Sequence, residues 1–107
     1  MISNGLFQSV KKRCGIPEQV TVYDESEIKP LIQDCLEDML TAGVPAWIME
    51  DNDTETNPRV LTCITLYVQG MRGQDRTETN RYISLYRRKL HKLMLEPEIA
   101  PAQKTDS

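Results

Sequence analysis

Apolar residues recur at helical spacing in the first half of the chain, over about residues 25–42. Alternating steps of three and one place them on a single stripe of a helix, with acidic and polar side chains on the other side. The members of this stripe are Ile28, Leu31, Ile32, Cys35, Leu36, Met39 and Leu40. The pattern predicts a long amphipathic helix.

The ends of this helix carry recognisable signals. Asp24 followed by Glu27 has the spacing of a capping box with an acidic first turn. Pro30 disfavours helical geometry in the residue before it, so we expect regular helix from near Ser26, with the proline in the first turn. Gly43 predicts the end of the helix.

A second helix is predicted to begin at Pro58, with Asn57 as its cap. Its apolar residues cover most of the circumference, which is typical of a helix buried on several sides. They are Val60, Leu61, Cys63, Ile64, Leu66, Tyr67, Val68 and Met71. The polar stripe left over consists of Thr62, Thr65, Gln69 and Arg72. We expect this helix to be the centre of the domain, with Gly70 and Gly73 loosening its end.

A third helix is predicted from about Glu78 to Met94, capped by Thr77 or Thr79. Its expected buried face consists of Tyr82, Ile83, Tyr86, Leu90, Leu93 and Met94. The opposite face is cationic and consists of Arg81, Arg87, Arg88, His91 and Lys92. Pro97 should end this helix.

The remaining segments are shorter or less regular. Residues 3–13 favour a short helix, 19–23 an extended linker, and 44–57 a loop with an apolar and an acidic half. The fold class is therefore all-α, a small helical bundle of three main helices plus a short N-terminal helix and an extended C-terminal tail. We expect a helical domain over residues 1–95 and a flexible tail over 96–107.

Charge divides the chain more sharply than its net value of −3 suggests. Residues 24–55 hold ten acids and one lysine, whereas residues 56–92 hold eight bases and two acids. Two interpretations are open: two solvated faces of one domain, or an acidic half that meets the basic half of a neighbouring subunit, as in a head-to-tail ring. The second makes Asp34, Glu37, Asp38, Arg81, Arg88 and Lys92 interface candidates.

The apolar half of the 44–57 loop adds Trp47, Ile48 and Met49 to these candidates, because tryptophan is favoured at interfaces. The alternative is that Trp47 folds back as a lid on the core.

Signs of catalysis or metal binding are weak. Cys14, Cys35 and Cys63 form no CxxC pair, and we interpret the last two as small core residues. His91 has no carboxylate three or four residues away, and the acidic run 51–55 lacks the glycine and distal glutamate of a calcium loop. We expect no enzyme activity, no cofactor and no metal site.

Membrane insertion and sequence-specific DNA binding are also disfavoured. The sequence has neither a long apolar run nor a secretory signal at its start. The connection over residues 72–77 is long for a helix-turn-helix, and the pI of about 5.1 is not that of a nucleic-acid-binding domain.

Two segments resemble the small head–tail connector proteins of long-tailed phages, also called head-completion or DNA-packaging proteins. Residues 22–32, VYDESEIKPLI, are similar to the acidic cap and "EIK-x-LI" start of that family's first long helix. Residues 57–70, NPRVLTCITLYVQG, are similar to its "DP-x-x-x-x-A-I-x-L-Y-V" helix. A short Gly/Asp turn and an acid-led helix follow, so the resemblance covers about residues 20–95.

This resemblance implies a virion protein at the head–tail interface, present in the host cytoplasm during assembly. It implies a homo-oligomeric ring, commonly a dodecamer, that binds beneath the portal protein and supports a downstream head-completion or tail protein. DNA would pass through the central channel without sequence-specific binding. Acidic residues could line that channel, and the tail after Pro97 could become ordered on docking. The alternative is a small helical binding or regulatory module, including a DNA-binding one.

Overall fold

A computed structural model of the protein describes residues 4–49, 57–72 and 76–96. Its elements are α1 (Asn4–Arg13), the π-helical turn η1 (Asp24–Ile28), α2 (Lys29–Ala42), α3 (Pro58–Arg72) and α4 (Arg76–Met94). Within these ranges there is no strand. The predicted all-α bundle, three main helices and a short N-terminal one, is confirmed.

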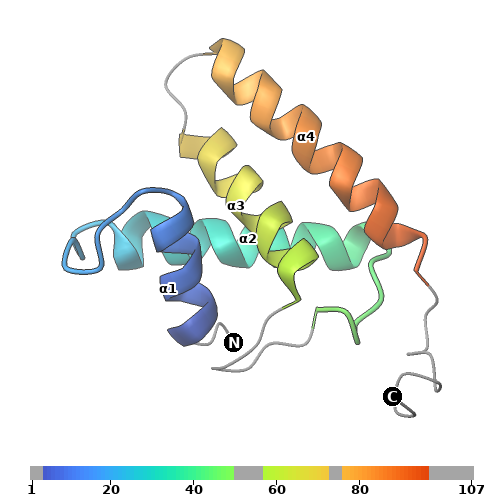
Figure 1. The fold of residues 1–107 in the computed structure, drawn as a ribbon, viewed down its shortest axis with the longest axis horizontal. Helices are drawn as coiled ribbons and strands as arrows, with labels where there is room; N and C mark the ends of the chain where they lie inside the picture. The colour runs from blue at the N-terminus through green and yellow to red at the C-terminus, as the bar shows by residue number, and fades with distance from the viewer. Residues whose placement is uncertain (1–3, 50–56, 73–75, 97–107) are drawn as a thin grey trace.

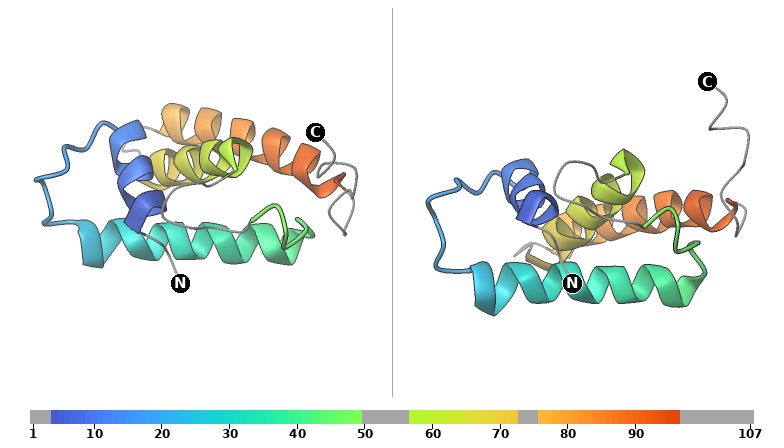
Figure 2. Two further views of the ribbon diagram at one scale, coloured as in Figure 1. Left: turned by 60° about the horizontal axis from the view of Figure 1, so that its bottom comes forward. Right: turned by 90° about the horizontal axis from the view of Figure 1, so that it is seen from below.

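The helices form two layers (Figure 1, Figure 2). One layer is α2 with η1 at its start, and the other contains α1, α3 and α4. Helices α3 and α4 run side by side in opposite directions, and α3 also contacts α1 and α2. The prediction that the second long helix is the centre of the domain agrees with this arrangement.

The core lies between the layers and draws residues from every helix. Its most buried members are Leu6, Phe7, Val10, Ile28, Ile32, Cys35, Met39, Val44, Ile48, Val60, Cys63, Ile64, Val68, Tyr86 and Leu93. Cys35 and Cys63 are both fully buried, as expected of core cysteines. Leu6, Phe7 and Val10 are buried on α1, so the predicted short N-terminal helix is amphipathic in the expected register.

The apolar stripes predicted for the helices are only partly buried. Ile32, Cys35 and Met39 of α2 are buried, but Leu40, which we placed on the same stripe, is 51% exposed. Met71 at the end of α3 is 50% exposed. These positions lie at the edge or end of their helices, beyond the reach of the facing layer, so membership of a stripe did not ensure burial.

Two predictions about α3 are wrong. Thr65, placed on the polar stripe, is buried, and its hydroxyl donates a 2.8 Å hydrogen bond to the carbonyl oxygen of Leu61. This local bond satisfies the hydroxyl without water. Gly70 does not loosen the helix end but is buried where α4 passes: a Cβ built on it would lie 2.8 Å from Cδ1 of Ile83. Glycine permits the close packing of α3 against α4.

Helix α4 begins earlier than predicted, at Arg76 rather than Glu78. Thr77 and Thr79 therefore lie inside the helix, and neither is its cap. Of the expected buried face, Tyr86, Leu90 and Leu93 are buried, whereas Met94 is 39% exposed in the last turn.

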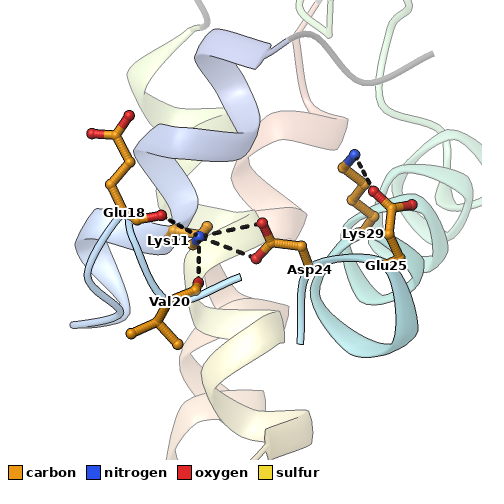
Figure 3. A network of polar contacts seen from close by, with 6 residues as sticks. All are labelled: Lys11, Glu18, Val20, Asp24, Glu25 and Lys29. Carbon is orange, nitrogen blue, oxygen red and sulfur yellow. Dashed lines mark hydrogen bonds and ion pairs between the residues drawn. The ribbon is translucent and has the colours of Figure 1, made fainter. Parts of the chain in front are cut away.

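The N-terminal segment is organised around Lys11, whose side chain is 1% exposed (Figure 3). Its Nζ donates hydrogen bonds to the carbonyl oxygens of Val20, at 2.8 Å, and Glu18, at 3.2 Å. It also lies 3.1 Å from Oδ1 of Asp24. Residues 18–23 consequently fold over α1 in turns, and the predicted extended linker over 19–23 is wrong.

The same contacts explain why the predicted capping box is absent. Asp24 pairs with Lys11, Glu27 forms an ion pair with Arg72 of α3, and η1 has no side-chain cap. Regular α-helix starts at Lys29, three residues later than expected, with Pro30 in its first turn as predicted. Gly43 ends α2 in the left-handed conformation, with φ of 112°. Tertiary ion pairs thus replaced the local cap.

Candidate interaction surfaces

The outward face of α2 is acidic. Asp34 and Glu37 are exposed there, and the amide of Gln33 donates a 3.0 Å hydrogen bond to Oε2 of Glu37. Helical geometry places this face on the side of α2 away from the core residues Ile32 and Cys35. Neither carboxylate forms an ion pair with a described residue. Both are therefore available to a partner.

Asp38, the third predicted acidic residue, has a partner within the chain. The hydroxyl of Tyr86 donates a 2.6 Å hydrogen bond to Oδ2 of Asp38, joining α4 to α2. Tyr86 is 3% exposed, and burial raises the pKa of its hydroxyl well above its ordinary value, with the bond to Asp38 adding to the shift. Asp38 thus has a structural contact whether or not it also meets a neighbour.

The outward face of α4 is basic. Arg81, Arg88 and Lys92 are all exposed and lie along one line of the helix, at spacings of seven and four residues. The Arg81 guanidinium lies 5.8 Å from the centre of the Tyr82 ring. The structure thus brings these three predicted residues onto one stripe.

The loop after α2 does not expose its apolar residues as the predicted interface would require. Ile48 is 2% exposed and belongs to the core, so in this conformation it presents no surface to a partner. Trp47 and Met49 are half-buried and pack against the core. This arrangement agrees with the interpretation of Trp47 as a lid. The acidic half of the loop, residues 50–56, lies outside the described residues.

A basic cleft lies between the start of α3 and the second half of α4. It has a volume of about 290 Å³ and is lined by Pro58, Arg59, Thr62, Lys89, Lys92 and Leu93. Arg59 pairs with Glu96, with 3.1 Å between its guanidinium nitrogen and Oε2. Nearby Cys63 is fully buried; burial raises its thiol pKa to about 11, although the positive charges of Lys89 and Arg59 act in the opposite direction. The cleft is therefore lined by a cluster of positively charged side chains.

Sequence reasoning identified only Lys92 among the charged residues of this cleft. Arg59 and Lys89 are thirty positions apart on different helices, and helical periodicity says nothing about which turns of α3 and α4 meet. Glu96, which we assigned to the tail, is held against α3 through Arg59.

A groove of mixed polar and apolar lining, about 440 Å³ in volume, lies elsewhere, between α2, α3 and α4. Its lining is Asp38, Ala42, Tyr67, Met71, Ile83, Tyr86, Arg87 and Leu90. The Tyr67 and Tyr86 rings meet edge to face there, with centroids 5.3 Å apart.

Metal-ligating side chains do not cluster in the part of the chain that the structure describes: no group of three or more His, Cys, Asp or Glu residues lies together there. His91 is exposed on α4. None of the described helices is long and apolar enough to cross a membrane.

These features define a small all-helical protein with charged surfaces on two helices that belong to opposite layers. The chain belongs to the phage connector protein family, whose family model matches residues 6–99. The expected resemblance to head–tail connectors is confirmed, and with it a structural connector role in the virion. No curated protein and no solved structure was found to match the chain.

Proposed function

We propose that this connector protein forms a ring of identical subunits, a dodecamer in the commonest arrangement, beneath the portal at the head–tail interface. The ring extends the DNA channel and supports a downstream head-completion or tail protein. The proposal rests on one observation: exposed acidic residues lie on α2 and exposed basic residues on α4, in opposite layers of the subunit.

Such a distribution suits a heterologous contact. When two different patches of a subunit pair head to tail, each added copy leaves the same two patches free at the ends, and the chain closes if the rotation per subunit allows it. The acidic outward face of α2 on one copy would lie against the basic outward face of α4 on the next. Because these charged faces are exposed, salt should weaken assembly.

DNA has a passive part in this proposal. Carboxylates of the acidic segment that do not pair with a neighbour would face the channel, where they offer phosphate groups no attraction. DNA would then slide past the ring without being read.

Reversal of the basic stripe tests the ring. The triple variant Arg81→Glu, Arg88→Glu, Lys92→Glu should stay folded by circular dichroism but fail to form the large species that light scattering detects with the wild type, alone or with the portal of the same phage. The matched control, Lys12→Glu, Arg76→Glu, Arg87→Glu, makes the same charge change at exposed positions outside the stripe. Unchanged assembly of the first variant would contradict the charge pairing.

A wild-type protein that stays monomeric and ignores the portal would contradict the ring itself. Salt-sensitive binding of duplex DNA by such a monomer would support the alternative of a small DNA-binding module.

A further inference from the structure

The basic cleft between α3 and α4 holds more positive charge than the described residues of the same chain neutralise. Lys89 and Lys92 both line it, and neither forms an ion pair with any described residue. They are three positions apart on α4, which places their side chains about 5–6 Å apart at the Cβ atoms. Pro58 and Leu93 form apolar walls beside them. The cleft thus combines a partly apolar surface with two cations that have no ion-pair partner among residues 4–49, 57–72 and 76–96.

A carboxylate is already bound at this cleft. Oε2 of Glu96 lies 3.1 Å from the guanidinium nitrogen of Arg59, with side-chain exposures of 52% for Arg59 and 30% for Glu96. The pair therefore remains open to solvent and to exchange. This internal contact indicates which functional group the cleft accepts: a carboxylate, held by a guanidinium.

The acidic face of α2 has the complementary spacing. Asp34 and Glu37 are also three positions apart, and both are exposed. The two carboxylates therefore match the two lysines of the cleft in spacing and are opposite to them in charge. Within one chain the two sets cannot meet, because α2 forms one layer and the cleft is lined by α3 and α4 of the other (Figure 2).

We propose that the cleft is the docking site for the acidic face of α2 from a second copy of this chain, with Asp34 and Glu37 paired to Lys89 and Lys92. Arg59 is a further contact, and Glu96 is an internal competitor that must give up Arg59 for the tightest association. This inference rests on the proposed ring and deepens it by naming Arg59, Lys89 and Glu96, which lie outside the stripe of Arg81, Arg88 and Lys92.

Zero-length cross-linking tests the contact directly. A carbodiimide joins a carboxylate to an amine only when the two are in contact, and a mixture of ¹⁵N-labelled and unlabelled full-length protein distinguishes bonds between chains from bonds within one. We expect mixed-isotope peptides that link Asp34 or Glu37 to Lys89 or Lys92. Their absence, alone and with the portal present, would overturn the proposal.

Charge exchange provides a second test. The variant Lys89→Glu, Lys92→Glu and the variant Asp34→Lys, Glu37→Lys should each self-associate about tenfold or more weakly than the wild type in sedimentation experiments. An equimolar mixture should recover association, because each cleft then meets a face of opposite charge. The matched control, Lys12→Glu, Arg76→Glu, should behave as wild type. Lack of recovery in the mixture would count against the pairing.

Glu96→Gln tests whether Glu96 competes with the neighbouring copy for Arg59 or only stabilises the subunit. Freed from its internal partner, Arg59 becomes available to the neighbour, so we expect association several-fold tighter than that of the wild type. An unchanged or weaker association would overturn the role of Glu96.

The outcomes distinguish this proposal from the ring. If the wild type assembles and the exchange variants assemble equally well, the proposed ring is supported, but the cleft is not its subunit contact. If the wild type never associates with itself or with the portal, both fail. If the cleft instead binds duplex DNA and loses it on reversal of Lys89 and Lys92, its ligand is phosphate and the proposal is overturned.

Discussion

The ammonium group of Lys11 lies 3.1 Å from Oδ1 of Asp24, and the lysine side chain is almost completely buried. Nζ also donates a 3.4 Å hydrogen bond to the other carboxylate oxygen, Oδ2, so both oxygens of Asp24 face the same ammonium group. The two residues connect α1 to the start of the α2 layer. Removal of the Lys11 ammonium group should lower the stability of the fold, because it would leave the Asp24 carboxylate without its counter-charge and two carbonyl oxygens without their donor.

Lys11→Met should therefore destabilise the fold. The methionine has similar length but leaves Asp24 and the carbonyl oxygens of Glu18 and Val20 without their donor. We expect a loss of roughly 2–3 kcal/mol in the free energy of unfolding, measured by urea denaturation. Lys12→Met, at the exposed neighbouring position, should change it by less than about 0.5 kcal/mol. Equal effects of the two substitutions would show that the buried network contributes nothing.

Tyr86→Phe tests the bond between α4 and α2. The ring still fills its site, but the bond to Asp38 is lost, and the exposed carboxylate can turn to water. We expect a loss of about 1 kcal/mol. A double-mutant cycle with Asp38→Ala, which removes the acceptor, should return a coupling energy of similar size, and a coupling near zero would contradict the contact. The same single variants, assayed for assembly, separate the structural contact of Asp38 from its predicted interface role.

Gly70→Ala tests the close approach of α3 and α4. Alanine favours helix over glycine by about 1 kcal/mol, but here its Cβ would lie 2.8 Å from Cδ1 of Ile83, so we expect a net loss of stability instead of a gain. In the Ile83→Ala background both this Cδ1 and Cγ1, which would lie 3.0 Å from the new Cβ, are missing. There, Gly70→Ala should be neutral or stabilising in thermal denaturation, whereas the same loss in both backgrounds would show that Ile83 is not the obstacle.

Alkaline pH should destabilise the protein through Cys63. Burial raises the pKa of its thiol from 9.0 to about 11, so the folded state holds the proton more tightly than the unfolded state. Its contribution to stability is complete below pH 9 and is lost progressively as the pH rises from 9 to about 11. Cys63→Ala should show a shallower decline of unfolding free energy across this window, measured by urea titration at each pH. Identical slopes would contradict the shift.

The sequence predicted the helices well because helix formation depends on spacing within one segment. The stripe of Ile28, Ile32, Cys35 and Met39, the start of α3 at Pro58 and the stop at Gly43 all appear in the structure. The exposed positions of Arg81, Arg88 and Lys92 followed from the same periodicity.

Errors arose where a residue had a choice between a local and a distant partner. Asp24 and Glu27 have the spacing of a cap, but Lys11 and Arg72, brought close by the fold, offered them ion pairs instead. Likewise, a glycine near the end of a helix is typical of a frayed end. Gly70 is instead a packing position, because Ile83 of α4 lies directly against it.

By itself, then, the sequence determined the fold class, the amphipathic faces and the separation of acidic from basic segments, since each is a property of residues close together along the chain. The tertiary structure alone decided that Lys11 is buried, that Ile48 belongs to the core, and that Arg59, Lys89 and Lys92 surround one cleft. These facts depend on which turns of different helices meet, and that is set by the packing of the whole core rather than by any one segment.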